Sequence, residues 1–92
     1  MKINLQTLHF KGSDNLKNFV EEKVSKLGKF DSSIISAEVT LTEDGGGLQS
    51  KTCDIRLIVP GNDDMVKKSA SSFEEAISEA VSTLQSILTA KK

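Results

Sequence analysis

The chain has 92 residues, a formal net charge of −1, 37% hydrophobic residues and 27% charged residues. These values are typical of one soluble globular domain. They exclude binding to nucleic acid through an overall positive charge of the chain. With four Phe and no Trp or Tyr, a broad base-stacking platform is excluded as well. No segment resembles a signal peptide or is long enough to span a membrane, and a lone Cys53 fits a reducing compartment. We therefore expect a single cytoplasmic domain over residues 1–92 without a membrane partner.

The first half of the chain predicts a strand followed by an amphipathic helix. Residues 2–10 alternate at first, and the parity breaks at Leu8, which indicates a bulge or bend at the end of the strand. Ser13 is a plausible N-cap for a helix that runs to about Leu27, where Gly28 supplies a stop. The apolar positions repeat at helical spacing: Leu16, Phe19, Val20, Val24 and Leu27.

The second half predicts three strands and a closing helix. Residues 34–43 and 51–59 alternate as strands and should pair antiparallel across the glycine-containing connection at 44–50. Pro60-Gly61 suits the centre of a type II turn, and residues 65–70 form a weaker strand. Ser71 and Glu74 match a capping box. The inward stripe of the last helix is Phe73, Ile77, Ala80, Val81, Leu84 and Leu88.

This order of elements predicts an α+β fold: a four-stranded, mostly antiparallel sheet with two helices packed on one face. Inward-facing side chains of the strands and helices should form one core between these layers. The expected core residues are Ile35, Val39, Ile55, Leu57, Phe19, Leu27, Ile77 and Leu84.

The residues that could carry catalysis have structural explanations. His9 is the only histidine, and Cys53 alternates towards the core. The acidic pairs at 63–64 and 74–75 fit a turn and a first helical turn, and the glycines at 45–47 lack the Lys-Ser/Thr pair of a phosphate-binding loop. We therefore expect no enzyme activity, no catalytic residue, no cofactor, no metal site and no small-molecule substrate.

Several lysines have positions that solubility alone does not explain. Lys23 falls inside the apolar stripe of the first helix, and Lys26 lies on its shoulder. Either their stems cover apolar surface while the charges reach water, or the two lysines line a phosphate-binding groove between the helices. Lys67 and Lys68 must point to opposite faces of their strand, where lysines also deter aggregation, and Lys29 can complement a helix dipole.

Three stretches of the sequence carry a family resemblance: "LHFKGSDNLKNFVEEKVSKLGKF", "DIRLIVPG" and "KKSASSFEEAISEAV". They resemble the short ribosome hibernation promoting factors, also called ribosome-associated inhibitor or sigma factor modulation proteins. The resemblance covers essentially the whole chain and implies a fold similar to a double-stranded RNA-binding domain. It also implies binding to the small ribosomal subunit and its rRNA, in the channel for mRNA and tRNA anticodons, which silences idle ribosomes.

The match to the family's basic positions is uneven along the chain. Ser78 and Ser82 stand where the family often has Asp, and residues 85–87 replace a stretch usually rich in Arg and Lys. Because rRNA affinity depends largely on phosphate neutralisation, we expect the contact to move to the first helix and fourth strand, with the second helix mainly structural. The rRNA-binding residues that the resemblance implies are Lys23, Lys26, Lys29, Lys67 and Lys68, with Lys91 and Lys92 restoring charge at the end.

The sequence thus predicts a translation regulator that promotes ribosome hibernation by blocking mRNA and tRNA. The chain stops where the long form of the family continues into a dimerisation domain, so we expect no self-driven pairing of ribosomes. The alternative is a protein-interaction module on the same fold that has lost rRNA binding and uses a neutral outer face around Ser82, Gln85, Ser86 and Thr89. A general binder of double-stranded RNA would need a broader basic surface.

Overall fold

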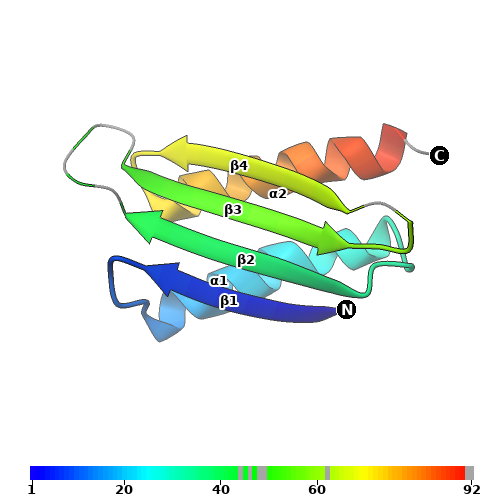
Figure 1. The fold of residues 1–92 in the computed structure, drawn as a ribbon, viewed down its shortest axis with the longest axis horizontal. Helices are drawn as coiled ribbons and strands as arrows, with labels where there is room; N and C mark the ends of the chain where they lie inside the picture. Colours follow the sequence, from blue (N-terminus) through cyan, green and yellow to red (C-terminus); the bar gives the residue numbers. More distant parts are fainter. Residues whose placement is uncertain (44, 46, 48–49, 62, 91–92) are drawn as a thin grey trace.

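The computed structural model describes residues 1–43, 45, 47, 50–61 and 63–90. The elements follow the predicted order of strand, helix, three strands and helix, with a short 3₁₀ helix (η1) directly after the first helix (Figure 1). Their bounds are β1 Lys2–Leu8, α1 Asp14–Ser25, η1 Lys26–Lys29, β2 Ser36–Glu43, β3 Lys51–Ile58, β4 Asp64–Ala70 and α2 Phe73–Ala90.

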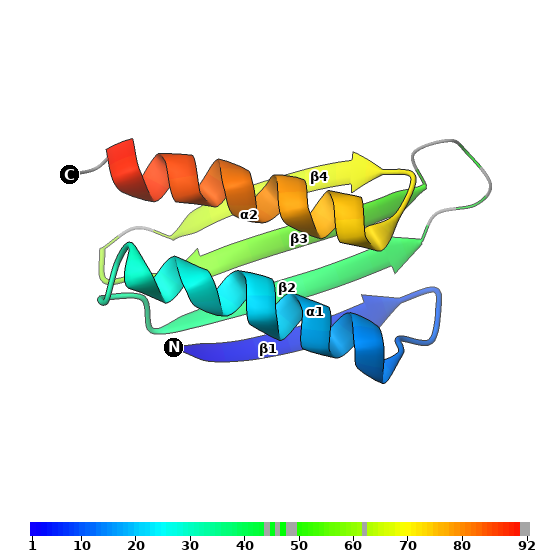
Figure 2. The same ribbon diagram turned by 180° about the vertical axis from the view of Figure 1, so that it is seen from behind.

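The strands form one mixed sheet in the order β1-β2-β3-β4. Strand β1 pairs with β2 in parallel, because α1 carries the chain back to the starting edge, and the other two pairings are antiparallel. Both helices cover the same face of the sheet, where they lie side by side and run in the same direction (Figure 2). The predicted α+β architecture is confirmed, and the opposite sheet face is left open.

The core lies between the sheet and the helices. Val39 lies opposite Ile55 in the β2–β3 ladder, and both side chains are buried against the helices. Phe19 is only half-buried, and the Lys23 ammonium lies over its ring. The predicted core residues that are fully buried are Leu27, Val39, Ile55, Leu57, Ile77 and Leu84.

Ile35 corrects the predicted core, since its side chain is 60% exposed. Strand β2 begins only at Ser36, and the alternation therefore does not extend back to residue 35. Ile34 takes the buried position instead, with 6% exposure.

The helix ends agree with the predictions in one case and differ in two. The Ser13 hydroxyl accepts a hydrogen bond from the Leu16 amide at 3.1 Å, which confirms the predicted N-cap. Gly28 does not stop the first helix, because it lies inside η1 and the helical path continues to Lys29. At α2 the N-cap is Ser72, one residue later than predicted. Its hydroxyl accepts from the Glu75 amide at 3.2 Å, while the Ser71 hydroxyl donates to the Glu75 carboxylate at 3.2 Å.

The turns between elements follow local chemistry. Strand β1 ends at Leu8, and His9 has a φ of 67°, which produces the bend that the broken parity predicts. Gly61 has a φ of 98°, as the third residue of a type II turn requires. Of the predicted connection at 44–50, residues 44, 46, 48 and 49 lie outside the described residues.

Candidate nucleic-acid interface

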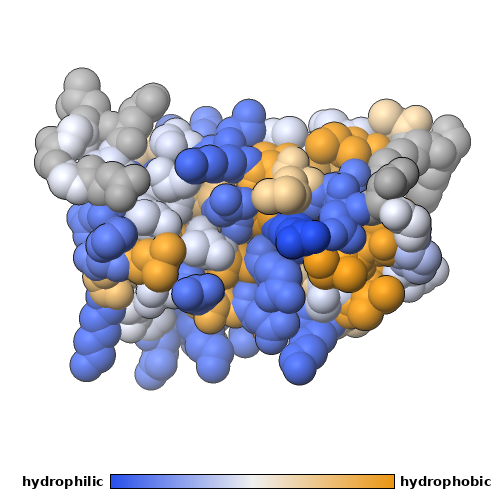
Figure 3. Space-filling view, viewed as in Figure 1, coloured by the Kyte–Doolittle hydropathy of each residue, from blue (hydrophilic) through white to orange (hydrophobic). Residues whose placement is uncertain are grey.

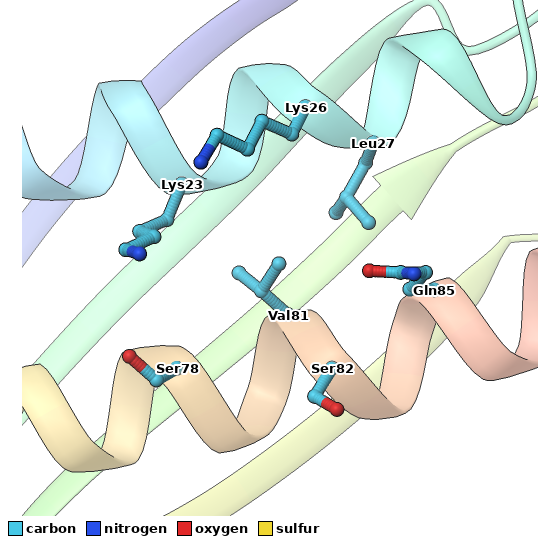
Figure 4. A pocket seen from close by; sticks show the side chains of 7 residues that line it. All are labelled: Lys23, Lys26, Leu27, Ser78, Val81, Ser82 and Gln85. Atoms are coloured by element: carbon cyan, nitrogen blue, oxygen red, sulfur yellow. The ribbon is translucent and has the colours of Figure 1, made fainter.

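A groove runs between α1 and α2 on the outer surface of the helix layer (Figure 4). Its volume is about 200 Å³, and we call it the interhelix groove. The residues that line it are Lys23, Lys26, Leu27, Ser78, Val81, Ser82 and Gln85. The two lysines come from α1 and η1, while the neutral polar residues come from the facing side of α2 (Figure 4). The groove therefore joins two cations with neutral hydrogen-bonding groups.

Lys23 combines the two interpretations that the sequence left open. Its side chain is half-buried, and its ammonium lies 5.5 Å from the centroid of the Phe19 ring, one helical turn earlier. The stem therefore covers apolar surface, as a partly buried lysine does, while the charge reaches the interhelix groove. Lys26 is exposed at the start of η1 and places a second ammonium group along the same groove.

The charge of the interhelix groove favours an anionic ligand. Its lining residues, all of which the structure describes, are cationic, neutral polar or apolar. Two ammonium groups without a neighbouring carboxylate in the lining attract phosphate, and the apolar floor of Leu27 and Val81 lowers the local dielectric constant. A phosphate oxygen in the groove could also accept hydrogen bonds from hydroxyl and amide groups of α2.

The residues that α2 contributes to this groove were not predicted from the sequence, although a groove between the helices was. The sequence predicts a mainly structural α2, and the structure places Ser78, Ser82 and Gln85 opposite the lysines of α1 and η1. The signal lay in their spacing, because positions 78, 82 and 85 recur at intervals of four and three and therefore share one helix face. Ser82 and Gln85 belong to the neutral outer face that the sequence assigns to the alternative function, and the position of this face beside the lysines becomes visible only in the fold.

The two adjacent lysines of β4 point to opposite faces of the sheet, as predicted. Lys68 is half-buried on the helix side, with Val66 and Ala70. Lys67 is exposed on the open face, where it lies opposite Asp54 in the β3–β4 ladder. Lys68 thus joins the surface that carries Lys23 and Lys26, whereas Lys67 is on the other side of the molecule.

Lysines near the ends of the helices complete the predicted set. Lys29 is exposed at the end of η1 and does not line the interhelix groove. Lys91 and Lys92 lie outside the described residues. The structure therefore brings Lys23, Lys26 and Lys68 to one surface and leaves Lys29 at its margin.

The open face of the sheet has a different character. Figure 3, which shows this face, has hydrophilic and hydrophobic side chains interspersed. Met65 of β4 lies on this face and is 62% exposed. Arg56 is paired with Asp63 at 2.9 and 2.5 Å, so this cation is already neutralised by a neighbour.

Cys53, one of the groups considered for catalysis, is a buried core residue. Burial, and secondarily the charge of Asp54, raises the pKa of the Cys53 thiol to about 12, which keeps it protonated at neutral pH. The described residues contain no group of three or more His, Cys, Asp or Glu side chains that could hold a metal ion. Among the helices described here, none is long and apolar enough to cross a membrane.

Comparisons with known proteins agree with this architecture. Residues 3–92 match the family model described as "Sigma 54 modulation protein / S30EA ribosomal protein". The N-terminal domain of Protein Y from Thermus thermophilus has a TM-score of 0.87 at 22% identity, with 100% of both chains covered. A ribosomal subunit interface protein from Coxiella burnetii has a TM-score of 0.88 at 15% identity, covering 99% of this chain and 97% of the other. No curated protein sequence matches the chain.

Proposed function

Because the chain belongs to the sigma 54 modulation protein / S30EA ribosomal protein family, we propose that it is a non-enzymatic translation regulator that binds the small ribosomal subunit. The observation that carries this proposal is the interhelix groove, in which Lys23 and Lys26 face neutral donors on α2. The similar solved proteins include one named for the ribosomal subunit interface, which supports a ribosomal partner.

In this proposal the helix layer binds the phosphate backbone of rRNA near the decoding region. The bound domain occupies the space that mRNA and tRNA anticodons need, so that the idle ribosome cannot initiate translation. No bond is made or broken in this mechanism. Regulation depends on occupancy alone.

Local charge must supply the attraction, since the net charge of the chain is −1. Each lysine that neutralises a phosphate releases a counterion and adds about 0.7–0.9 to the slope of log affinity against log salt concentration. Three lysines on the helix side, Lys23, Lys26 and Lys68, therefore predict a modest slope. We leave Lys67 out of the interface because it is on the open face of the sheet.

The decisive experiment is binding of the purified protein to purified small subunits, followed by co-sedimentation at several salt concentrations. Lys23→Glu with Lys26→Glu reverses the charge of the interhelix groove and should abolish co-sedimentation. The matched control is Lys2→Glu with Lys67→Glu, which makes the same charge change at two exposed residues of the open face. The control should bind like the unchanged protein.

Two results would count against this proposal. Equal losses from the two double variants would show that overall charge, and not the interhelix groove, governs binding. No co-sedimentation of the unchanged protein even at low salt would favour a protein-interaction module on the same fold.

A further inference from the structure

Helix α2 separates two grooves, and both contain lysines. The first is the interhelix groove with Lys23 and Lys26. The second lies between α2 and β4, has a volume of about 420 Å³ and contains Lys68. Ser78 and Ser82 line both grooves, so we call these two residues the serine crest. The crest is exposed and uncharged, with cations on either side.

The hydroxyl groups of the serine crest differ from the others on the exposed side of α2. Thr83 donates to the Glu79 carbonyl at 2.9 Å, and Ser86 donates to the Ser82 carbonyl at 3.2 Å. Within the described residues, the hydroxyls of Ser78 and Ser82 make no such bond. Their O–H groups are therefore available to a ligand.

The crest hydroxyls point to different sides of α2. In Figure 4 the Ser78 hydroxyl points towards α1 and Lys23, whereas the Ser82 hydroxyl points away from α1. One donor thus serves each groove. The two residues are one turn apart, or about 6 Å along the helix axis.

We propose that an RNA phosphodiester backbone crosses α2 at the serine crest, so that phosphates lie in both grooves. Lys23 and Lys26 neutralise the phosphate on the α1 side, and Lys68 neutralises the phosphate on the β4 side. Ser78 and Ser82 donate hydrogen bonds to the phosphate oxygens. This inference rests on the proposed function and assigns α2 a direct part in it.

The size and charge of the crest residues suit this crossing. Serine is small enough to let a sugar-phosphate backbone approach the helix. Its side chain also carries no negative charge that would repel the phosphates. An Asp at either position would place a carboxylate between the two lysine-bearing grooves and repel phosphate.

Glu79 is the one acidic residue among those that line the second groove. Its carboxylate shares this groove with Lys68 and opposes a phosphate there. The β4 side should consequently be the weaker of the two contacts. Removing this charge by Glu79→Gln should tighten binding to small subunits about three- to tenfold at low salt, a range typical of one close charge at a protein surface.

Equilibrium binding to small subunits across a salt series separates the neutral donors from the cations. Ser78→Ala with Ser82→Ala should weaken binding roughly tenfold, since hydrogen bonds to charged groups are among the stronger ones. The salt slope should stay unchanged, because no charge is removed. Lys68→Ala should lower the slope by about 0.7–0.9. The control is Ser86→Ala with Thr89→Ala, whose hydroxyls bond to helix carbonyls. It should bind like the unchanged protein.

A crosslinking experiment tests the location directly. Cys53 is fully buried, so a single introduced cysteine can be labelled selectively. A photo-crosslinker on Ser82→Cys should attach to rRNA in the bound complex. The same reagent on Asn4→Cys, an exposed residue of β1 on the open face, should not.

The outcomes distinguish this inference from the function on which it rests. If the unchanged protein does not bind small subunits, the proposed function fails. If it binds, but the crest double variant binds equally well and Ser82→Cys gives no rRNA crosslink, the crossing at the crest is wrong while the function stands.

Discussion

The Lys23 ammonium lies 5.5 Å from the centroid of the Phe19 ring, and the same side chain lines the interhelix groove. One residue thus combines a packing role with a charge, and the two roles can be separated by substitution. Lys23→Met keeps a long apolar stem over the ring and removes the charge. We expect it to unfold at nearly the same urea concentration as the unchanged protein and to bind small subunits with a salt slope lower by about 0.7–0.9.

Lys23→Ala is the matched comparison, because it removes the stem and the charge together. It should show the same loss of slope and in addition lose about 0.5–1 kcal/mol of stability relative to Lys23→Met, because the half-buried stem no longer covers apolar surface. An unchanged salt slope for both variants would mean that Lys23 has only the packing role.

Leu84 tests the core between α2 and the sheet. Its side chain has 0% exposure, and Leu84→Ala should lower the free energy of unfolding by about 2–5 kcal/mol. Urea unfolding monitored by circular dichroism measures this loss. Ile35→Ala is the control, since a 60% exposed side chain away from special features should cost no more than about 0.5 kcal/mol. Comparable losses from the two variants would contradict this placement of the core.

The sequence predicted the core where alternation and helical spacing agree with the extent of the elements. Val39 and Leu84 satisfy this condition and are buried. Ile35 fits the same alternation but lies one residue before the start of β2, so its parity carries no information about burial. Strand boundaries depend on hydrogen-bond partners elsewhere in the chain, which a local pattern does not contain.

The capping prediction differed from the structure for a related reason. Ser71 and Ser72 are adjacent, and each has an acidic residue three positions later, so the sequence alone allows either serine to cap α2. The structure selects Ser72, because Phe73 then enters the core and stacks on Phe10 with 4.5 Å between ring centroids. Tertiary packing decides between two locally equivalent caps.

The candidate site was predicted only in part. Charge and helical phase identified Lys23 and Lys26, and strand parity separated Lys67 from Lys68. The position of Ser78 and Ser82 beside the lysines was not predicted, because it arises only when α2 lies beside α1. That arrangement depends on how both helices pack on the sheet.

Cys53 gives the fold a defined dependence on alkaline pH. Its pKa is raised from 9.0 to about 12, so the folded state resists a deprotonation that the unfolded chain undergoes more readily. The stabilisation is fully present below pH 9.0 and decreases as the pH rises towards 12, by about 1.4 kcal/mol per pH unit. Unfolding by urea between pH 8.5 and 10.5 measures this dependence. In Cys53→Ala this loss of stability with rising pH should be absent. An identical pH dependence of stability in the two proteins would contradict the prediction.

Gln85 and Ser86 are neighbours on α2 and provide a matched test of the groove. Gln85 lines the interhelix groove, whereas Ser86 is exposed outside its lining. Gln85→Arg therefore adds a cation beside Lys23 and Lys26, and it should tighten binding to small subunits and raise the salt slope by about 0.7–0.9. Ser86→Arg adds the same charge one position further along and should change the slope by clearly less. Equal gains from the two variants, measured over the same salt series, would show that any positive charge on α2 suffices and that the groove does not select the phosphate.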